Sequence, residues 1–211
     1  LTDARLEKVM VNECILREVN LAAVTMVESS LMNSDFRDAW FTLEPVTKCI
    51  FNESDFTGVS LDGVKFLECL LNDAKLCDTT GAVTLEKCIA NKADFSNADW
   101  SGGRVFECIA QEAVFAGANL EQTELSFSMM QKSDVRGTRL PEKMEHCNLS
   151  EAKHDWSSLK GRNFSTVSLD GVNLAGLDLS EANFHLSSFR SCDLSNADFT
   201  GSNLESAHLD E

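Results

Sequence analysis

Basic residues are scarce in this chain of 211 residues, which has 18 lysines and arginines against 34 aspartates and glutamates. The resulting net charge of −16 argues against direct binding to a nucleic acid backbone or to anionic lipid, because both are bound mainly through Lys and Arg. The charge suits a soluble protein, or one that binds a basic protein surface.

Long apolar runs and cysteine pairs are also missing. No run approaches the roughly 20 residues that a membrane-spanning helix needs, and the segment from Leu1 to Leu6 does not have the apolar stretch of a signal peptide. Leu1 is not a methionine, so we expect the chain to be a fragment of a longer protein. The eight cysteines form no CxxC pair, which with the missing secretory signal predicts a reducing compartment, the cytoplasm.

Apolar side chains recur at every fifth position. From Leu1 to Leu76 all sixteen positions of this series are apolar. The series shifts by one residue near Gly81 and again between Pro141 and Met144, and then continues to the end of the chain. Neither an α-helix nor a β-strand has this period, because a helix would spread these residues around its circumference and a strand would place them on both faces.

A small side chain lies two positions before most of these apolar residues. The clearest copies are Ala93-Asp94-Phe95, Ala98-Asp99-Trp100, Ala118-Asn119-Leu120, Ala182-Asn183-Phe184 and Ala197-Asp198-Phe199. In this pattern the chain resembles, over essentially its whole length, the pentapeptide-repeat family, whose unit reads A-(D/N)-L-x-x. The resemblance implies an all-β fold, a right-handed quadrilateral parallel β-helix with about 10 coils that forms a single domain over residues 1–211. The apolar central residue and the small residue would point inward, and the other three positions outward.

Stacking of residues about 20 apart gives an independent check of this fold. The inward positions then align Cys49, Cys69, Cys88 and Cys108 in one column. An outward ladder of amides would contain Asn52, Asn72, Asn91, Gln111 and Gln131. Beside it, Lys48, Glu68, Lys87 and Glu107 alternate in sign, as neighbouring rungs of a sheet should. These columns are independent of the five-residue period, so they support the β-helix.

Irregularities of the repeat share one expected corner of the square. They are the stretch Leu43-Glu44-Pro45, the shift near Gly81, the pair Gly102-Gly103 and the shift at Pro141. Corners tolerate insertions and deletions, since they lie on the surface and leave the walls in register. The alternative is a corner shaped for a partner.

Residues with catalytic or metal-binding chemistry do not form a recognisable site. Of His146, His154, His185 and His208, only His154 takes a central inward position, where we expect a satisfied core histidine or a local distortion with Asp155 and Trp156. The cysteine column lies along a line, whereas tetrahedral zinc needs ligands that converge on a point. Small inward thiols that fill the core are the expected role, and Cys77 is expected to be outward and free. The sequence therefore predicts no metal site, no cofactor and no enzyme activity.

One wall carries an unusual outward position. Just before the central residue, where the family pattern has Asp or Asn, this wall has Ile50, Leu70, Ile89, Ile109 and Met129. An apolar stripe with polar edges is typical of a partner-binding or dimerisation surface, but β-branched residues in a column also stabilise a sheet. The neighbouring wall has Asp35, Asp55, Asp94, Asp134 and Asp193 at the same position, a column expected to solvate the rod.

Three functions are compatible with these features of the sequence. The first is a non-catalytic protein-interaction scaffold that binds a protein partner or a second copy of the chain, similar to the β-helix part of bacterial secreted effectors that act in the host cytoplasm. The second is mimicry of a DNA duplex, because some acidic members of the family bind type II topoisomerases such as DNA gyrase and protect them from quinolones. The third is the substrate-recruiting domain of a larger effector enzyme.

Overall fold

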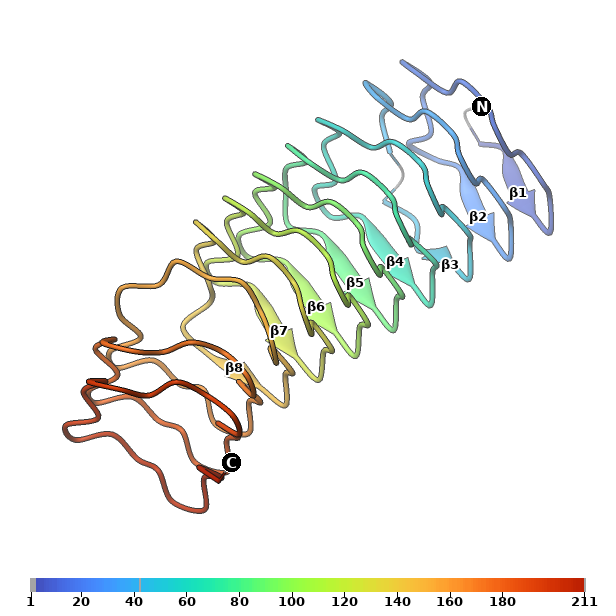
Figure 1. Cartoon of the computed structure of the whole chain (residues 1–211). Helices are drawn as coiled ribbons and strands as arrows, with labels where there is room; N and C mark the ends of the chain where they lie inside the picture. Colours follow the sequence, from blue (N-terminus) through green and yellow to red (C-terminus); the bar gives the residue numbers. More distant parts are fainter. Residues whose placement is uncertain (1–2, 42, 211) are drawn as a thin grey trace.

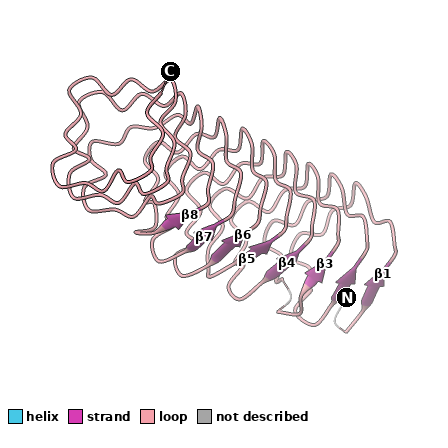
Figure 2. Cartoon of the chain, turned by 90° about the horizontal axis from the view of Figure 1, so that it is seen from below, coloured by secondary structure: helices cyan, strands magenta, loops and turns pink. Residues whose placement is uncertain are grey.

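A computed structural model describes residues 3–41 and 43–210 as a rod of stacked turns (Figure 1). Eight short strands form one sheet in chain order, and each strand pairs in parallel with the next. The strands are β1 (Arg5–Glu7), β2 (Thr25–Val27), β3 (Val46–Thr47), β4 (Lys65–Leu67), β5 (Thr84–Glu86), β6 (Arg104–Phe106), β7 (Glu124–Ser126) and β8 (Met144–Glu145). Figure 2 shows these strands along one edge of the rod, with turns and loops elsewhere.

Four parallel ladders run along the rod and define its four walls. Wall A contains the strands. The other three walls are held by single bridges between consecutive turns: wall B runs from Met10 to His208, wall C from Ile15 to Asp193 and wall D from Asn20 to Asp198. Since the chain meets the walls in the order A, B, C, D, wall B lies opposite wall D. The quadrilateral parallel β-helix expected from the sequence is confirmed.

The number of regularly paired turns is lower than expected. The sheet of wall A has about seven turns through its strand pairings, slightly fewer than the ten expected from the repeats. Beyond Glu145, wall A continues by single bridges at Asn163, Asn183 and Asn203. Each of these asparagines accepts a hydrogen bond from the backbone N–H two residues ahead, as Asn163 Oδ1 does from Ser165 at 3.1 Å. This side-chain bond turns the chain after one paired residue, so no strand forms there.

Central side chains fill the interior of the rod. The apolar residues of the five-residue series are buried from Leu21 to Phe189, with exceptions at Gly81 and His154. Aromatic rings stack between turns, as those of Phe36 and Phe56 do with centroids 4.7 Å apart. The inward direction of the central residues is therefore confirmed.

The Asp or Asn of the repeat has a structural role at the corners. Asp55 Oδ1 accepts a hydrogen bond of 3.0 Å from the backbone N–H of Thr57, and Asp94 Oδ1 does the same for Ser96 at 2.9 Å. The following corner residue takes a left-handed conformation, as Asn97 does with φ of 57°. This Asx turn satisfies a backbone donor that the corner would leave unpaired.

The four irregularities do lie at one corner, between walls D and A. Gly81 closes a shortened corner there, since its carbonyl accepts a 2.8 Å bond from the N–H of Val83. Its φ is +106°, and a Cβ at this position would lie 2.5 Å from the backbone of Asp62, so only glycine fits. At the same corner Pro45 has no N–H for the ladder, and β3 starts one residue late at Val46.

His154 departs from its expected inward position and produces the local distortion. Its ring is half-buried and stacks on Trp156 with centroids 4.4 Å apart. Its Nε2 lies 2.6 Å from the carbonyl oxygen of Asn173. At other central positions the backbone N–H donates to the equivalent carbonyl oxygen of the next turn, as the N–H of Val135 does to Lys153 at 2.8 Å. Because the His154 side chain occupies the carbonyl instead, no bridge joins Lys153 to Asn173 among the described residues.

Candidate protein-interaction surface on wall B

The five apolar residues predicted to form a surface lie in one continuous ladder. Direct bridges join each to the next on wall B, in the order Ile50, Leu70, Ile89, Ile109 and Met129. We call this set the wall B stripe. Its first four side chains are half-buried because each lies against its neighbours, and Met129 is 48% exposed. Ser30 and Asn148 occupy the next rungs, so the stripe has polar residues at both ends.

The wall B stripe replaces residues that elsewhere make Asx turns, and a second set of side chains takes over the lost hydrogen bonds. The backbone N–H of Asn72 donates to Asn52 Oδ1 at 2.9 Å. The N–H groups of Asn91 and Gln111 likewise donate to Asn72 Oδ1 and Asn91 Oδ1, each at 3.0 Å. The predicted amide ladder is thus confirmed from Asn52 to Gln111. Its physical role is to satisfy, from the preceding turn, the donors that an Asp or Asn in the stripe would have satisfied.

Two linked changes therefore distinguish this wall from the others. An isoleucine at position 89 alone would leave the N–H of Asn91 without an acceptor in the described structure, at a cost of about 1 kcal/mol or more. The amide of Asn72 removes that cost and leaves the outward position available for an apolar side chain. The combination shows how the rod accommodates the apolar residues Leu70, Ile89 and Ile109 on wall B while the corner N–H groups of the next residues but one keep their hydrogen bonds.

Aromatic residues at the corner between walls A and B extend the apolar area, and they were not predicted from the sequence. Phe127 is 50% exposed, and its ring centroid lies 5.6 Å from that of Phe106 and 4.4 Å from that of His146. Arg104 places its guanidinium carbon 4.3 Å from the centre of the Phe106 ring. The sequence does mark Phe127 as unusual, because the preceding turns have Lys or Glu at the position that Phe127 occupies.

Charges of alternating sign line this same corner, as predicted. Lys48 lies 3.8 Å from Glu68, and Lys87 lies 3.7 Å from Glu107. These pairs are exposed, so they add little to stability. They form a charged border along the wall B stripe, as is typical of the rim of a protein interface.

Comparison with known proteins agrees with this architecture. A family model described as pentapeptide repeats matches eight copies in the chain, over residues 1–38, 109–141, 147–185 and 168–205. The chain belongs to the pentapeptide-repeat family. No curated protein sequence matches the chain.

Solved structures of other pentapeptide-repeat proteins share the fold. HetL, a protein involved in heterocyst differentiation regulation from the cyanobacterium Nostoc sp. strain PCC 7120, is 20% identical with a TM-score of 0.60, over 99% of this chain and 88% of that one. QnrB1, a plasmid-mediated fluoroquinolone resistance protein, is 18% identical with a TM-score of 0.51, over 94% of this chain and 90% of that one. At these identities the likeness shows the fold alone.

The cysteine column lies inside the pentapeptide-repeat rod. Cys49, Cys69, Cys88 and Cys108 are all buried, and the Sγ of Cys69 lies 3.3 Å from the carbonyl oxygen of Val46. Burial raises the pKa of Cys49, so its thiol is protonated at neutral pH. No three His, Cys, Asp or Glu residues within 3–41 and 43–210 are placed to hold a metal ion.

Two further cysteines differ in burial. Cys147 continues the same column, and burial raises its pKa to about 11. Cys77, expected to be outward and free, is half-buried with its Sγ 3.2 Å from the hydroxyl oxygen of Thr57.

The aspartates of wall C do not form a continuous anionic face. Asp35 is paired with Arg17 at 2.5 Å and with Arg37 at 2.7 Å, and Asp134 is paired with Arg136 at 2.5 Å. The bond from Arg136 lowers the pKa of Asp134. The ladder is also interrupted by other residue types, namely Lys75, Val114 and Lys153.

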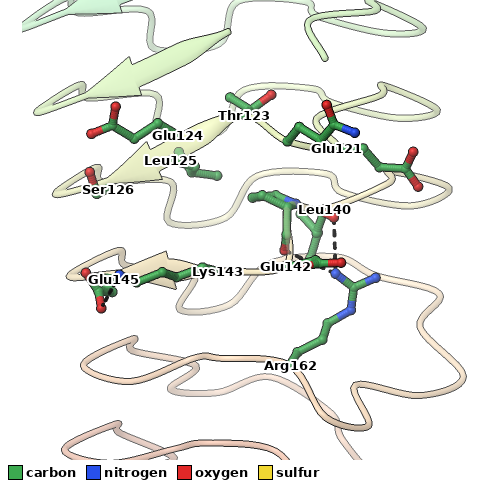
Figure 3. A pocket seen from close by; sticks show the side chains of 12 residues that line it. Glu121, Thr123, Glu124, Leu125, Ser126, Leu140, Glu142, Lys143, Glu145 and Arg162 are labelled. Carbon is green, nitrogen blue, oxygen red and sulfur yellow. Dashed lines mark hydrogen bonds and ion pairs between the residues drawn. The ribbon is translucent and has the colours of Figure 1, made fainter. Parts of the chain in front are cut away.

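The shortened corner at Pro141 leaves a hollow of about 730 Å³ between walls D and A (Figure 3). The Arg162 guanidinium crosses the shortened corner and donates hydrogen bonds of 3.1 Å to the carbonyl oxygens of Leu140 and Pro141. Glutamates line the hollow, but Glu124 is paired with Arg104 at 3.0 Å, and Glu145 with Lys143 at 3.1 Å. The hollow is therefore explained by the residue missing from the repeat at Pro141 and by Arg162, which bonds the carbonyl groups of the shortened corner.

No described segment forms a helix of the length and apolar character required to cross a bilayer.

Proposed function

We propose that this chain is a non-catalytic scaffold that binds a protein partner through the wall B stripe. The observation that carries the proposal is the exchange of hydrogen bonds on wall B, where the amide ladder takes over the corner donors and the stripe is left apolar. If the wall B stripe only stabilised the sheet, the apolar surface would not need to continue around the corner to the half-exposed ring of Phe127. An apolar centre with a charged border is the typical anatomy of an interface.

Partner binding is tested with a substitution that the rod tolerates. Ile89→Asp and Ile109→Asp together place two charges in the stripe. We expect the fold to persist, because an aspartate at these positions can make the Asx turn found on wall C. Val114→Asp is the matched control, since Val114 is a half-buried apolar residue at the same outward position on wall C.

Affinity capture from cytoplasmic extract, quantified by mass spectrometry, then compares the three proteins. We expect a partner bound by the wild type and by Val114→Asp to be lost with the double variant. Sedimentation velocity follows self-association in the same samples and identifies a homodimer if the second copy is the partner. Equal capture and equal association by all three proteins would remove the stripe from consideration.

We propose that the protein acts in a cytoplasm. This is either the bacterial cytoplasm or, if the protein is a secreted effector, the cytoplasm of a host cell. Eight free cysteines, five of them buried in the core, fit a reducing compartment. A role as the recruiting domain of a larger effector enzyme uses the same surface and gives the same result in the capture experiment.

Mimicry of a DNA duplex is the second candidate function, favoured by the net charge of −16 and by the fold shared with QnrB1. Against it stands the pairing of Asp35 and Asp134 with arginines on wall C, which interrupts the anionic surface. A gyrase supercoiling assay with a quinolone separates the two functions, because only a mimic restores supercoiling.

A further inference from the structure

An exposed tryptophan stands on wall D, opposite the wall B stripe. Trp40 takes the outward position before the central residue Phe41 and is 65% exposed. It is bridged to Asn20 of the preceding turn, whereas no bridge joins it to Ser60 of the next turn among the described residues. The wall therefore opens on one side of the indole.

A shallow hollow of about 600 Å³ lies at this opening. Its lining residues are Glu18, Asp38, Ala39, Trp40, Gly58, Val59 and Ser60. Gly58 creates part of the space, since a Cβ added there would meet no atom within 4 Å. Glu18 and Asp38 occupy the equivalent corner position in the two preceding turns, so their carboxylates stand in line with this gap.

Both carboxylates lack a partner in the described part of the chain. The cations nearest in sequence, Arg17 and Arg37, turn toward wall C and bind Asp35 at 2.5 Å and 2.7 Å. No ion pair or side-chain hydrogen bond engages Glu18 or Asp38 among residues 3–41 and 43–210, unlike the glutamates Glu124 and Glu145 of the Pro141 hollow. One hollow thus combines an exposed indole face with two unneutralised negative charges.

We propose that this hollow binds the guanidinium of an arginine side chain on a protein partner. A guanidinium stacks on an indole face by a cation–π contact and offers several N–H donors to the two carboxylates. Arginine fits better than lysine because its planar group can do both at once. The net charge of −16 draws a basic partner to the rod. The site is independent of the wall B stripe, since it lies on the opposite wall.

The test follows the indole N–H signals of the protein by NMR while a blocked hexapeptide of alternating arginine and glycine is added. Trp40→Phe identifies the Trp40 signal among the three tryptophans. We expect a saturable shift of the Trp40 signal and no shift for Trp100, which is buried. A peptide with citrulline in place of arginine keeps the planar shape without the charge, and we expect it to give no saturable shift.

A matched pair of variants tests the carboxylates. Glu18→Gln with Asp38→Asn should weaken binding of the arginine peptide about fivefold or more. The control is Glu53→Gln with Asp73→Asn, which removes two charges from consecutive turns at the next corner and should leave the affinity within about twofold. Equal weakening by both variants, binding of the citrulline peptide, or no saturable shift at Trp40 would overturn the proposal.

Discussion

Asn72 and Ile89 should show a strong energetic coupling, although both are outward residues. Removing the Asn72 amide with Asn72→Ala leaves the N–H of Asn91 without its 3.0 Å acceptor. Because Asn91 is half-buried, water replaces part of this bond, and we expect a cost of about 1 kcal/mol. That cost corresponds to a rise of roughly fivefold in hydrogen exchange at the Asn91 amide if exchange occurs through local opening.

Ile89→Asn should supply the missing acceptor from within the same turn. Asn148 shows the geometry on the same wall, where its Oδ1 accepts a 2.9 Å bond from the N–H of Ser150. In the Ile89→Asn background, Asn72→Ala should therefore cost much less, and the coupling between the two substitutions should be about 1 kcal/mol. Hydrogen exchange measured by NMR at Asn91 reports this cycle directly.

The control replaces the stripe residue with one on wall C. Val114→Asn makes the same kind of change away from Asn91, and it should not reduce the cost of Asn72→Ala. If Ile89→Asn fails to protect the Asn91 amide when Asn72 is alanine, the stripe and the amide ladder are not linked as described. Wall B would then not be specialised to carry apolar side chains at its outward position.

Three further predictions concern the core and the charges. Trp100→Phe should destabilise the rod by about 1–3 kcal/mol in urea unfolding, because it removes buried volume and the 3.0 Å bond from the indole N–H to a buried threonine. The Cys147 thiol, with a pKa of about 11, should react with iodoacetamide at pH 8 far more slowly than Cys77, and equal labelling in a peptide map would contradict its burial. Asp134 has a pKa lowered from 3.8 by the bond from Arg136, so its ionised form stabilises the fold above that pH and the contribution disappears as pH falls through the lower folded value. Asp134→Asn, which keeps the Asx turn, should accordingly lower the urea midpoint at pH 7, and the difference from the wild type should shrink as the pH falls below 3.8.

Much of the architecture could be predicted because each turn repeats a local pattern. Central residues such as Phe36 and Phe56 are apolar at a fixed spacing, and the small residues before them admit only an inward position in a narrow square coil. The alignment of Ile89 with Ile109 and of Asn72 with Asn91 follows from the same spacing. The candidate stripe was therefore visible in the sequence.

The side chains that accept hydrogen bonds from the corner N–H groups could not be predicted. These bonds join different turns, and they depend on the direction in which each side chain points. The sequence shows that Asn72 and Asn91 share a column, but not that the first bonds the backbone of the second. It places His154 at a central position, yet the ring turns toward Asn173 and stacks on Trp156.

The sequence by itself determined the five-residue period, because this depends only on residue spacing along the chain. The family resemblance implied four repeats per turn, and the columns about 20 residues apart follow from that number. Only the tertiary structure decided which polar groups are satisfied and which remain open. Arg17 and Arg37 lie next to Glu18 and Asp38 in the sequence, but they bind Asp35 across the corner. The physical reason is that a long charged side chain can reach partners in its own turn, as Arg37 does, or in the next turn, as Arg17 does. The carboxylates beside Trp40 could therefore be recognised as open only once the turns were stacked.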